Sequence, residues 1–432
     1  MQTLRHLPHF LRNAFAIAFC AGTACAYGQT VEPVWSLAQK EKPAVLETLK
    51  TLVSIESGSR DLEGLEKIAA ALAQRFAALG AKVELLDMGT DIVRFTDTPE
   101  RVGKVMRATL TGTGTKKILL LAHMDTVYPR GMLAQQPFKI DGGRAWGLGI
   151  ADDRHGMTVI LHSLAILKAL NFRDYGTLTV LINADEEINS PGSRKVITEM
   201  GAAHDAVMSF EGTPVTADQV RLATSGIAQA IINVKGQASH AGSAPERGVN
   251  ALNELAHQIL QAGDLSDEAR GIKVNWTMAS AGIVRNMIPP AAQAFADIRV
   301  ERLSDLDSVE QKLRERIKVK RIPEANVELL FERTFPPLEK TEASKSLALH
   351  AQGIYGEIGK KLIVQERPTG GGTDAANASL KTKAPVVEGF GLQGFGSHST
   401  NAEYVLIDSI EPRLYLTTRM IMDIASGKAP LR

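Results

Sequence analysis

The sequence predicts an α/β catalytic domain, built on a mostly parallel sheet flanked by helices, with a smaller α+β domain inserted into it. Three observations lead to this fold class. Apolar strand-like runs alternate with helical patterns, which is typical of a parallel sheet covered by helices. Clusters of His, Asp and Glu follow several of these runs, at the strand ends where α/β enzymes collect catalytic side chains. A central stretch without such clusters has its own order of strands and helices.

The segment before the insertion, residues 27–224, is predicted to be the first part of the catalytic domain. Helices are expected over 35–55, 62–79 and 156–170, and strands over 83–86, 108–111, 117–122, 178–184 and 205–210. In the third helix the apolar residues Val159, Ile160, Leu164 and Leu167 recur at helical spacing. The strand-like runs are short and apolar, as expected for strands buried on both faces.

Residues 225–336 are predicted to form the inserted domain. Strands are expected over 227–234, 273–281, 294–300 and 327–332, and helices over 250–262 and 306–319. The resulting order, strand-helix-strand-strand-helix-strand, is that of ferredoxin-like domains.

Residues 337–432 return to the first pattern and are predicted to complete the catalytic domain. Helices are expected over 344–355 and 409–425, and strands near Leu362 and Val386. An insertion between the two parts explains why the candidate ligand His398 stands so far from the other candidates in the sequence.

Length and charge restrict the class of protein. A chain of 432 residues is long for one domain, so two are expected. Hydrophobic residues make up 44% and charged residues 22%, as in ordinary globular proteins. The net charge of +1 supplies neither a basic field for nucleic acid nor a polybasic face for a membrane. We therefore expect a small-molecule substrate and no nucleic-acid or membrane partner.

The N-terminus predicts a signal peptide over residues 1–26. Two arginines precede the apolar run 14–18, and Ala24-Cys25-Ala26 has the pattern of a cleavage site. The alternatives are an amphipathic helix, or a lipoprotein signal at Cys25, which is disfavoured by Gly22 where leucine is usual. Both cysteines lie within this segment, so the mature chain would have neither disulfides nor thiolate ligands. We expect a periplasmic or secreted protein without a membrane span.

Five clusters along the chain contain the side chains that point to metal chemistry. They are His123-Met124-Asp125, Asp152-Asp153, Asp185-Glu186-Glu187, Ser209-Phe210-Glu211 and Ser397-His398. Histidine nitrogens and carboxylate oxygens form a ligand set suited to zinc. The first four clusters are each expected to close a strand-like run.

Two of these clusters suggest a division of roles. His123 and Asp125 lie on one side of an extended segment, so His123 can bind metal while Asp125 accepts its other ring N–H. Glu186 and Glu187 are neighbours whose side chains point differently, so one carboxylate can bind metal while the other activates a water. Each cluster alone has a plainer interpretation as solvated surface residues. Several such clusters at comparable strand ends favour a hydrolytic metal centre.

The chain resembles the dinuclear-zinc exopeptidases and deacylases that include aminoacylase, succinyl-diaminopimelate desuccinylase and peptidase T. Within that family it looks most like the carboxypeptidase G type, glutamate carboxypeptidases that cleave folates. The matching stretches include LLLAHMDTVYPRG, GLGIADDRHG, NADEEINSPGSR, SFEGTP, GQASHAGSAPERGVNAL, ERPTGGGTDAANA and GFGSHSTNAEYV. TSGIA and NWTMASAG match as well, and the resemblance spans roughly residues 35–428. The resemblance implies a zinc-exopeptidase catalytic domain with an inserted lid and dimerisation domain.

The resemblance also implies two zinc ions per chain, held by His123, Asp152, Glu187, Glu211 and His398. Asp152 would bridge the ions, with His123 and Glu211 completing one site and Glu187 and His398 the other. Glu186 would be the general base and acid.

Further roles are implied for residues around the metal ligands. Asp125 would be the partner of His123, and His240 of the insertion would stabilise the oxyanion in the neighbouring subunit of a homodimer. The substrate's terminal carboxylate would be held by Asn286, Arg299, Gly371, Gly372 and Thr373.

These residues predict hydrolysis of an amide bond to a C-terminal amino acid, with glutamate as the implied leaving group. The substrate would be an N-acyl amino acid, a folate-like molecule or a short peptide. Gln219 and Phe335 stand where close relatives carry basic residues, although Arg221 and Arg333 are nearby. A broader aminoacylase or dipeptidase is therefore the alternative. A catalytically dead periplasmic binding protein would lack a ligand or the base, and none is missing here.

Overall fold

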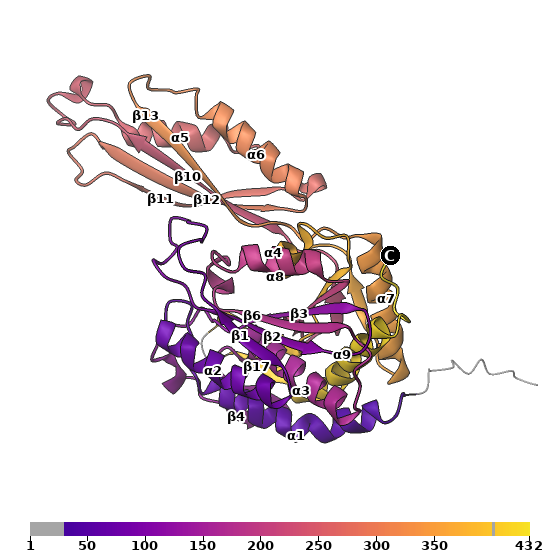
Figure 1. The fold of residues 1–432 in the computed structure, drawn as a ribbon. Helices are drawn as coiled ribbons and strands as arrows, with labels where there is room; N and C mark the ends of the chain where they lie inside the picture. Colours follow the sequence, from indigo (N-terminus) through magenta and orange to yellow (C-terminus); the bar gives the residue numbers. More distant parts are fainter. Residues whose placement is uncertain (1–29, 400–401) are drawn as a thin grey trace, which may run out of the picture.

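The computed structural model of the chain describes residues 30–399 and 402–432. The predicted signal peptide, residues 1–26, lies outside the described residues together with both cysteines. A larger α/β body carries a smaller α+β body on one side (Figure 1). This arrangement confirms the predicted fold class.

The larger body is built on an eight-stranded sheet with the order β1–β2–β6–β3–β7–β15–β9–β14. Its strands are β1 (Lys82–Leu86), β2 (Val105–Thr111), β3 (Lys117–His123), β6 (Thr177–Asn183), β7 (Ala206–Ser209), β9 (Gln219–Arg221), β14 (Ile363–Gln365) and β15 (Val386–Glu388). The central strands β6, β3, β7 and β15 run parallel. The strands β1 and β2 continue the sheet in antiparallel order.

Helices cover both faces of this sheet. They are α1 (Val34–Val53), α2 (Leu62–Ala78), α3 (His155–Ala169), α4 (Arg194–Ala203), α7 (Glu342–Glu357), α8 (Asp374–Ser379) and α9 (Ile410–Ala425). In β3, Ile118 and Leu120 join the core beneath α1, α2, α3 and α9, whereas Leu119 and Leu121 join the core beneath α4 and α8. Alternate residues of a strand point to opposite faces, so this unbroken apolar run is buried on both sides.

A second, five-stranded sheet of short strands lies beside the first. Its order is β4–β5–β17–β16–β8, with β4 (Lys139–Asp141), β5 (Arg144–Trp146), β8 (Thr213–Pro214), β16 (Gln393–Phe395) and β17 (Tyr404–Leu406). Strands of two or three residues are too short to show an alternating pattern, and the sequence did not predict this sheet. It brings the segments after β5 and β16 close to the ends of the main strands.

The smaller body contains β10 (Gly226–Lys235), α5 (Ala251–Gln261), β11 (Lys273–Ala281), β12 (Ala291–Val300), α6 (Leu303–Arg316) and β13 (Asn326–Phe335). Its four strands are antiparallel in the order β11–β12–β10–β13. This is the predicted ferredoxin-like arrangement. Asn250 caps α5 by accepting the backbone N–H of Asn253 at 3.1 Å.

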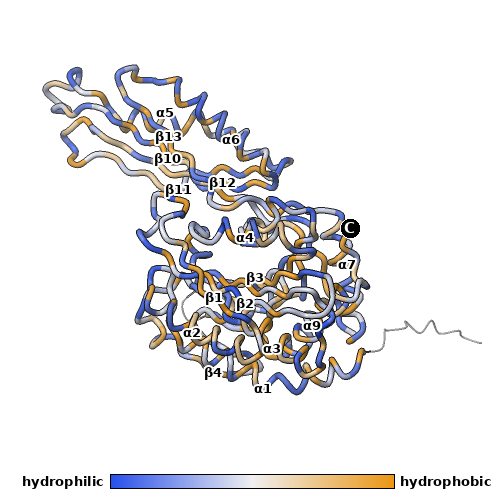
Figure 2. The backbone as a smooth tube through the Cα atoms, viewed as in Figure 1, coloured by the Kyte–Doolittle hydropathy of each residue, from blue (hydrophilic) through white to orange (hydrophobic). Residues whose placement is uncertain are grey.

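Two adjacent segments connect the bodies. Thr224 N–H donates to the carbonyl of Leu338 at 3.1 Å, so the segment that enters the smaller body is hydrogen-bonded to the segment that leaves it. Figure 2 shows hydrophobic residues along the central strands of the larger body, whereas α6 on the outside of the smaller body is mainly hydrophilic. In the part of the chain that the structure describes, no helix combines the length and apolar character needed to cross a membrane.

Candidate active site

Three of the candidate ligands lie at the carboxyl ends of the central parallel strands. His123 is the last residue of β3, Glu187 follows β6 in a short helical turn, and Glu211 lies two residues after β7. Because β3 is hydrogen-bonded to both β6 and β7 in parallel, all three side chains arrive at the same edge of the sheet. This is the placement expected from the sequence.

The position of Asp152 differs from the prediction that it closes a strand. It does not close a strand of the main sheet, because it follows the three-residue strand β5 within a distorted helical turn at Ile150–Arg154. Its backbone is extended there, with φ −163° and ψ 92°. His398 follows β16 in the left-handed conformation, with φ 62°. Both residues are therefore positioned by the second sheet and its connections.

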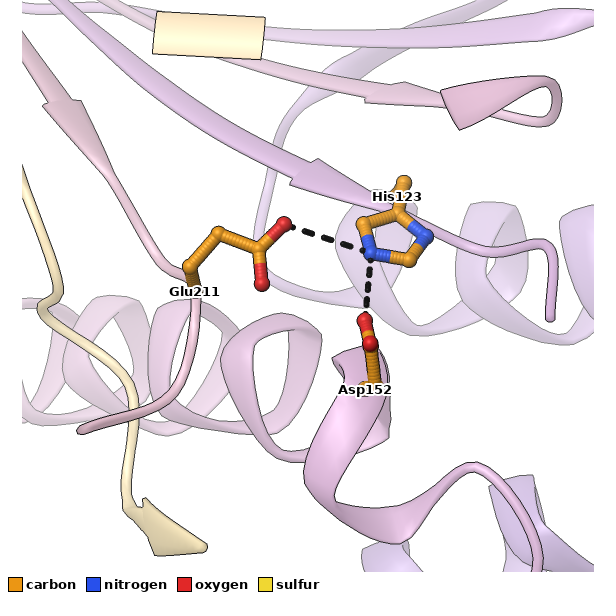
Figure 3. A group of neighbouring side chains, drawn as sticks. All are labelled: His123, Asp152 and Glu211. Atoms are coloured by element: carbon orange, nitrogen blue, oxygen red, sulfur yellow. Dashed lines mark hydrogen bonds and ion pairs between the residues drawn. The ribbon is translucent and has the colours of Figure 1, made fainter. Parts of the chain in front are cut away.

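The five residues form two groups that share Asp152. In the first group, His123 Nε2 lies 3.0 Å from Asp152 Oδ1 and 3.4 Å from Glu211 Oε1 (Figure 3). In the second group, His398 Nε2 lies 3.2 Å from Asp152 Oδ2 and 3.1 Å from Glu187 Oε2. Asp152 thus presents one carboxylate oxygen to each group.

The donor atoms of both groups fit metal ions. In each group one histidine nitrogen and two carboxylate oxygens lie within 4.8 Å of one another, which matches the three protein ligands of a catalytic zinc site. Glu187 Oε1 is buried and has no hydrogen-bond partner among the described residues. A buried carboxylate oxygen without a donor is costly, and a cation would satisfy it.

Several neighbouring carboxylates shift the pKa values of the two histidine ligands. Burial alone would lower the pKa of His123, but its contacts with Asp125, Asp152 and Glu211 raise that pKa well above its usual value. Hydrogen bonds that His398 donates to Asp152 and Glu187 raise the pKa of its imidazole to about 10. The neighbouring carboxylates thus favour positive charge at both imidazoles, and a divalent cation would supply that charge in place of protons.

Asp125 and Glu186 lie beside the first group. Asp125 is fully buried, and its Oδ1 lies 3.4 Å from His123 Nδ1. The same carboxylate accepts the backbone N–H groups of Glu186 and Glu187, each at 3.1 Å, and the hydroxyl of Ser59 at 2.8 Å. Asp125 thus orients the imidazole and fixes the turn after β6. Glu186 belongs to neither group of ligands and is half-buried.

Glu403 is a site residue that the sequence reasoning missed. It is fully buried, its Oε2 accepts the N–H of Gly149 at 2.8 Å, and its Oε1 accepts the N–H of Ala151 at 2.8 Å. The hydroxyl of Tyr128 donates to Oε2 at 2.9 Å. Glu403 therefore holds the turn that presents Asp152. An acidic residue beside the apolar run at 404–406 was the available signal.

His240 and Asn286 lie together in the smaller body. Ala241 N–H donates to the carbonyl of Asn286 at 2.9 Å, and both His240 and Asn286 are exposed. His240 Nδ1 accepts the N–H groups of Gly242 and Ser243, which leaves Nε2 without a described partner. Among the described residues, no contact joins this pair to the ligands of the same chain.

Arg299 and the glycine-rich turn meet across the two bodies. Arg299 Nη1 donates to the carbonyl of Gly370 at 3.1 Å, while its Nε and Nη2 bind the carboxylate of Asp297. A Cβ on Gly372 would lie 2.7 Å from Ile227 of β10, so the turn packs too closely for a larger residue. Thr373 is buried and caps α8 through the N–H of Ala375.

Comparison with known proteins agrees with this geometry. The model of peptidase family M20/M25/M40 matches residues 119–423. Carboxypeptidase G2 of Pseudomonas sp. (strain RS-16) is 45% identical over 413 residues, covering 96% of this chain and 97% of that protein. An acetylornithine deacetylase of Proteus mirabilis is 27% identical over 54% of this chain and 63% of its own length.

Solved structures share the fold at lower identity. The aminopeptidase PepT of Bacillus cereus superimposes with a TM-score of 0.72 at 21% identity, covering 89% of this chain and 99% of its own. A metallo-carboxypeptidase of Sulfolobus solfataricus gives a TM-score of 0.70 at 16% identity, covering 90% and 99%. The two carboxylate-rich groups agree with a family match over most of the chain and with a relative that spans nearly its whole length. The chain belongs to the M20/M25/M40 family of peptidases and is a metallopeptidase hydrolase.

Proposed function

We propose that this chain is a dinuclear zinc exopeptidase that hydrolyses the amide bond to a C-terminal amino acid, with glutamate as the leaving group. One observation carries the proposal: two three-residue ligand groups share Asp152 through its two carboxylate oxygens, and Glu186 lies beside them without belonging to either. The relative named carboxypeptidase G2 supports the carboxypeptidase activity. The substrate would be an N-acyl amino acid, a folate-like molecule or a short peptide.

The residues have distinct roles in this reaction. His123, Asp152 and Glu211 would hold one zinc ion, and Asp152, Glu187 and His398 would hold the other. Bound there, the metals would lower the pKa of a water to about 7 and polarise the scissile carbonyl. Glu186 would accept the proton of the attacking water and return it to the nitrogen of the leaving amine.

The inserted segment would act as a lid and a dimerisation domain. We propose boundaries at residues 225–336 for this domain, with 27–224 and 337–432 forming the catalytic domain. His240 is exposed and its Nε2 has no described partner in its own chain, which supports a role for His240 as an oxyanion donor in a second copy. Asn286, Arg299 and the Gly371–Thr373 turn would hold the substrate's α-carboxylate.

We also propose export of the chain. The positively charged start, the apolar run and the Ala24-Cys25-Ala26 site support a signal peptide over residues 1–26. Removal of that segment would deliver a protein without cysteine to the periplasm or the medium.

A broader aminoacylase or dipeptidase is the second candidate function. It is favoured by Gln219 and Phe335, which stand where close relatives carry basic residues. An enzyme of this kind would accept neutral leaving residues as well as glutamate.

The test is a panel of matched substrates on the zinc-loaded enzyme, together with its metal content. We expect two zinc ions per chain, hydrolysis of N-acyl-glutamate, and rejection of the same substrate with its α-carboxylate amidated, because a neutral amide accepts weaker hydrogen bonds than a carboxylate from the groups proposed to hold it. Efficient cleavage of the α-amide would contradict exopeptidase action. A higher kcat/KM for N-acyl-alanine or N-acyl-phenylalanine would favour the broader enzyme. Full activity with one zinc per chain would contradict the dinuclear centre.

A further inference from the structure

Two cavities lie beside the candidate metal centre, one next to each group of ligands. The Glu211 cavity has a volume of about 390 Å³ and is lined by residues that include Glu211, Gln219, Arg221, Thr369 and Ser397. The Glu187 cavity has a volume of about 450 Å³ and is lined by residues that include Glu187, Thr126, Val127 and Tyr128. Both volumes lie within the range of small-molecule sites. A substrate whose scissile bond lies at the metals would extend into both.

Arg221 brings an incompletely paired cation to the wall of the Glu211 cavity. Its Nη2 donates to the carbonyl of Gly212 at 2.8 Å and lies 3.9 Å from Glu388 Oε1. Its Nε is buried and unpartnered, and Nη1 likewise has no acceptor among the described residues. Because the side chain is only 18% exposed, water compensates this shortage weakly. A carboxylate in the cavity would supply an acceptor for Nη1 and balance the charge of the guanidinium.

The other candidate arginine, Arg333, stands two residues before Phe335, and its charge is already balanced. Arg333 lies on β13, and all three of its nitrogens donate to carboxylates of α6: Nη1 to Asp307 at 2.6 Å, and Nε and Nη2 to Glu310. Its side chain is 40% exposed. Two carboxylates therefore already balance the charge of Arg333, which leaves Arg221 as the candidate for a second substrate carboxylate.

The glycine-rich turn gives the substrate its direction. Thr369 lines the Glu211 cavity, and the next residue, Gly370, accepts a hydrogen bond from Arg299. The residues proposed to hold the α-carboxylate thus adjoin the Glu211 cavity. The leaving amino acid would therefore lie on the Arg221 side, with the acyl group on the other side of the metals.

We propose that Arg221 binds the side-chain carboxylate of the leaving amino acid in the Glu211 cavity, while the acyl group occupies the Glu187 cavity. This inference rests on the proposed exopeptidase function and explains how an acidic leaving group is selected although Gln219 and Phe335 are uncharged. Arg221 is then a specificity-determining residue that binds substrate.

Equilibrium binding separates this inference from the catalytic proposal. N-acetyl-glutamate and N-acetyl-glutamine are nearly isosteric and differ in side-chain charge, and the zinc-loaded Glu186→Gln variant would bind them without turnover. We expect tighter binding of N-acetyl-glutamate by calorimetry, by on the order of 10- to 100-fold, which is typical of hydrogen bonds to charged groups. Equal binding, or tighter binding of N-acetyl-glutamine, would overturn the role of Arg221. The measurement decides this even if the wild-type enzyme hydrolyses neither compound, which would contradict the proposed function alone.

Substitutions assign the preference to one arginine. Arg221→Gln should bring the ratio of the two dissociation constants close to one, and Arg221→Lys should retain part of it because the charge remains. Arg333→Gln is the matched control and should leave the ratio unchanged. If Arg221→Gln does not fold, the lysine variant and the wild-type ratio still decide. A ratio that survives in a folded Arg221→Gln variant, or that disappears in Arg333→Gln, would refute the assignment.

The direction of the substrate has its own test. Val127 lines the Glu187 cavity and is 40% exposed, so Val127→Trp should narrow that cavity. We expect kcat/KM to fall more for N-benzoyl-glutamate than for N-acetyl-glutamate, with the preference for glutamate over glutamine retained. Loss of that preference without discrimination between the acyl groups would mean that the substrate lies in the opposite direction.

Discussion

Replacing Glu403 by glutamine tests whether this carboxylate holds the turn that presents Asp152. The carboxylate accepts three hydrogen bonds, from the N–H groups of Gly149 and Ala151 and from the hydroxyl of Tyr128. In the variant, the amide oxygen could still accept from Ala151, but the amide NH₂ would face the N–H of Gly149. The hydroxyl of Tyr128 can rotate and accept, so one backbone donor remains unsatisfied.

The cost follows from that count. One buried donor without an acceptor costs about 1–3 kcal/mol, which corresponds to about 5- to 150-fold in an equilibrium constant. If the turn must keep its shape to bind metal, this cost lowers zinc affinity. Substitution of a residue that orients a metal ligand typically costs about 10- to 100-fold in metal affinity, in the same range.

The assay is competition between the protein and a chromogenic chelator for zinc, with circular dichroism to confirm folding. Tyr128→Phe is the graded comparison, because it removes one hydrogen bond to Glu403 and should cost about 0.5–1.5 kcal/mol. Glu366→Gln is the surface control, because Glu366 pairs with Lys340 and Lys345 on the outside of the chain and should leave zinc affinity unchanged. A folded Glu403→Gln variant with wild-type zinc affinity would refute the positioning role.

Three further predictions concern the base, the lid and acid stability. Glu186→Gln should keep two zinc ions and substrate affinity but lose several orders of magnitude in kcat, whereas Glu187→Gln should lose metal. Identical behaviour of the two variants in metal analysis and kinetics would contradict the assignment of proton transfer to Glu186 and metal binding to Glu187. His240→Ala should fold but be inactive, and mixing it with Glu186→Gln should restore part of the activity through hybrid dimers; subunit exchange without recovery would argue against action across a dimer. Burial lowers the pKa of His204 despite its hydrogen bond to the carbonyl of Met200, so the folded chain binds fewer protons than the unfolded chain below about pH 6.5, and stability falls as pH falls. His204→Gln should flatten the decline of Tm with acidification, and an unchanged slope would refute this account.

The sequence predicted the long elements because their patterns extend over enough residues to be read. Residues 117–122 form an apolar run that becomes β3, and the strand predicted over 273–281 has the bounds of β11. The five short strands of the second sheet escaped prediction, since a pattern of period two needs more than three residues. The sequence also wrongly placed Asp152 at the end of a strand, because it does not reveal the distorted helical turn at Ile150–Arg154 that follows β5.

The sequence alone determined the family, the ligand types and the positions at which a metal centre could form, because those depend on side-chain chemistry and on motifs that stay together along the chain. Tertiary structure decided which atoms meet. Glu403 and Gly149 are distant in sequence and become neighbours only when β17 pairs with β5. Likewise, the sequence alone does not distinguish Arg221 from Arg333, whereas their partners in the structure do. Three nitrogens of Arg333 are bound to carboxylates, and two nitrogens of Arg221 remain unpaired beside a cavity. Charge pairing depends on distances in space, which the order of residues does not contain.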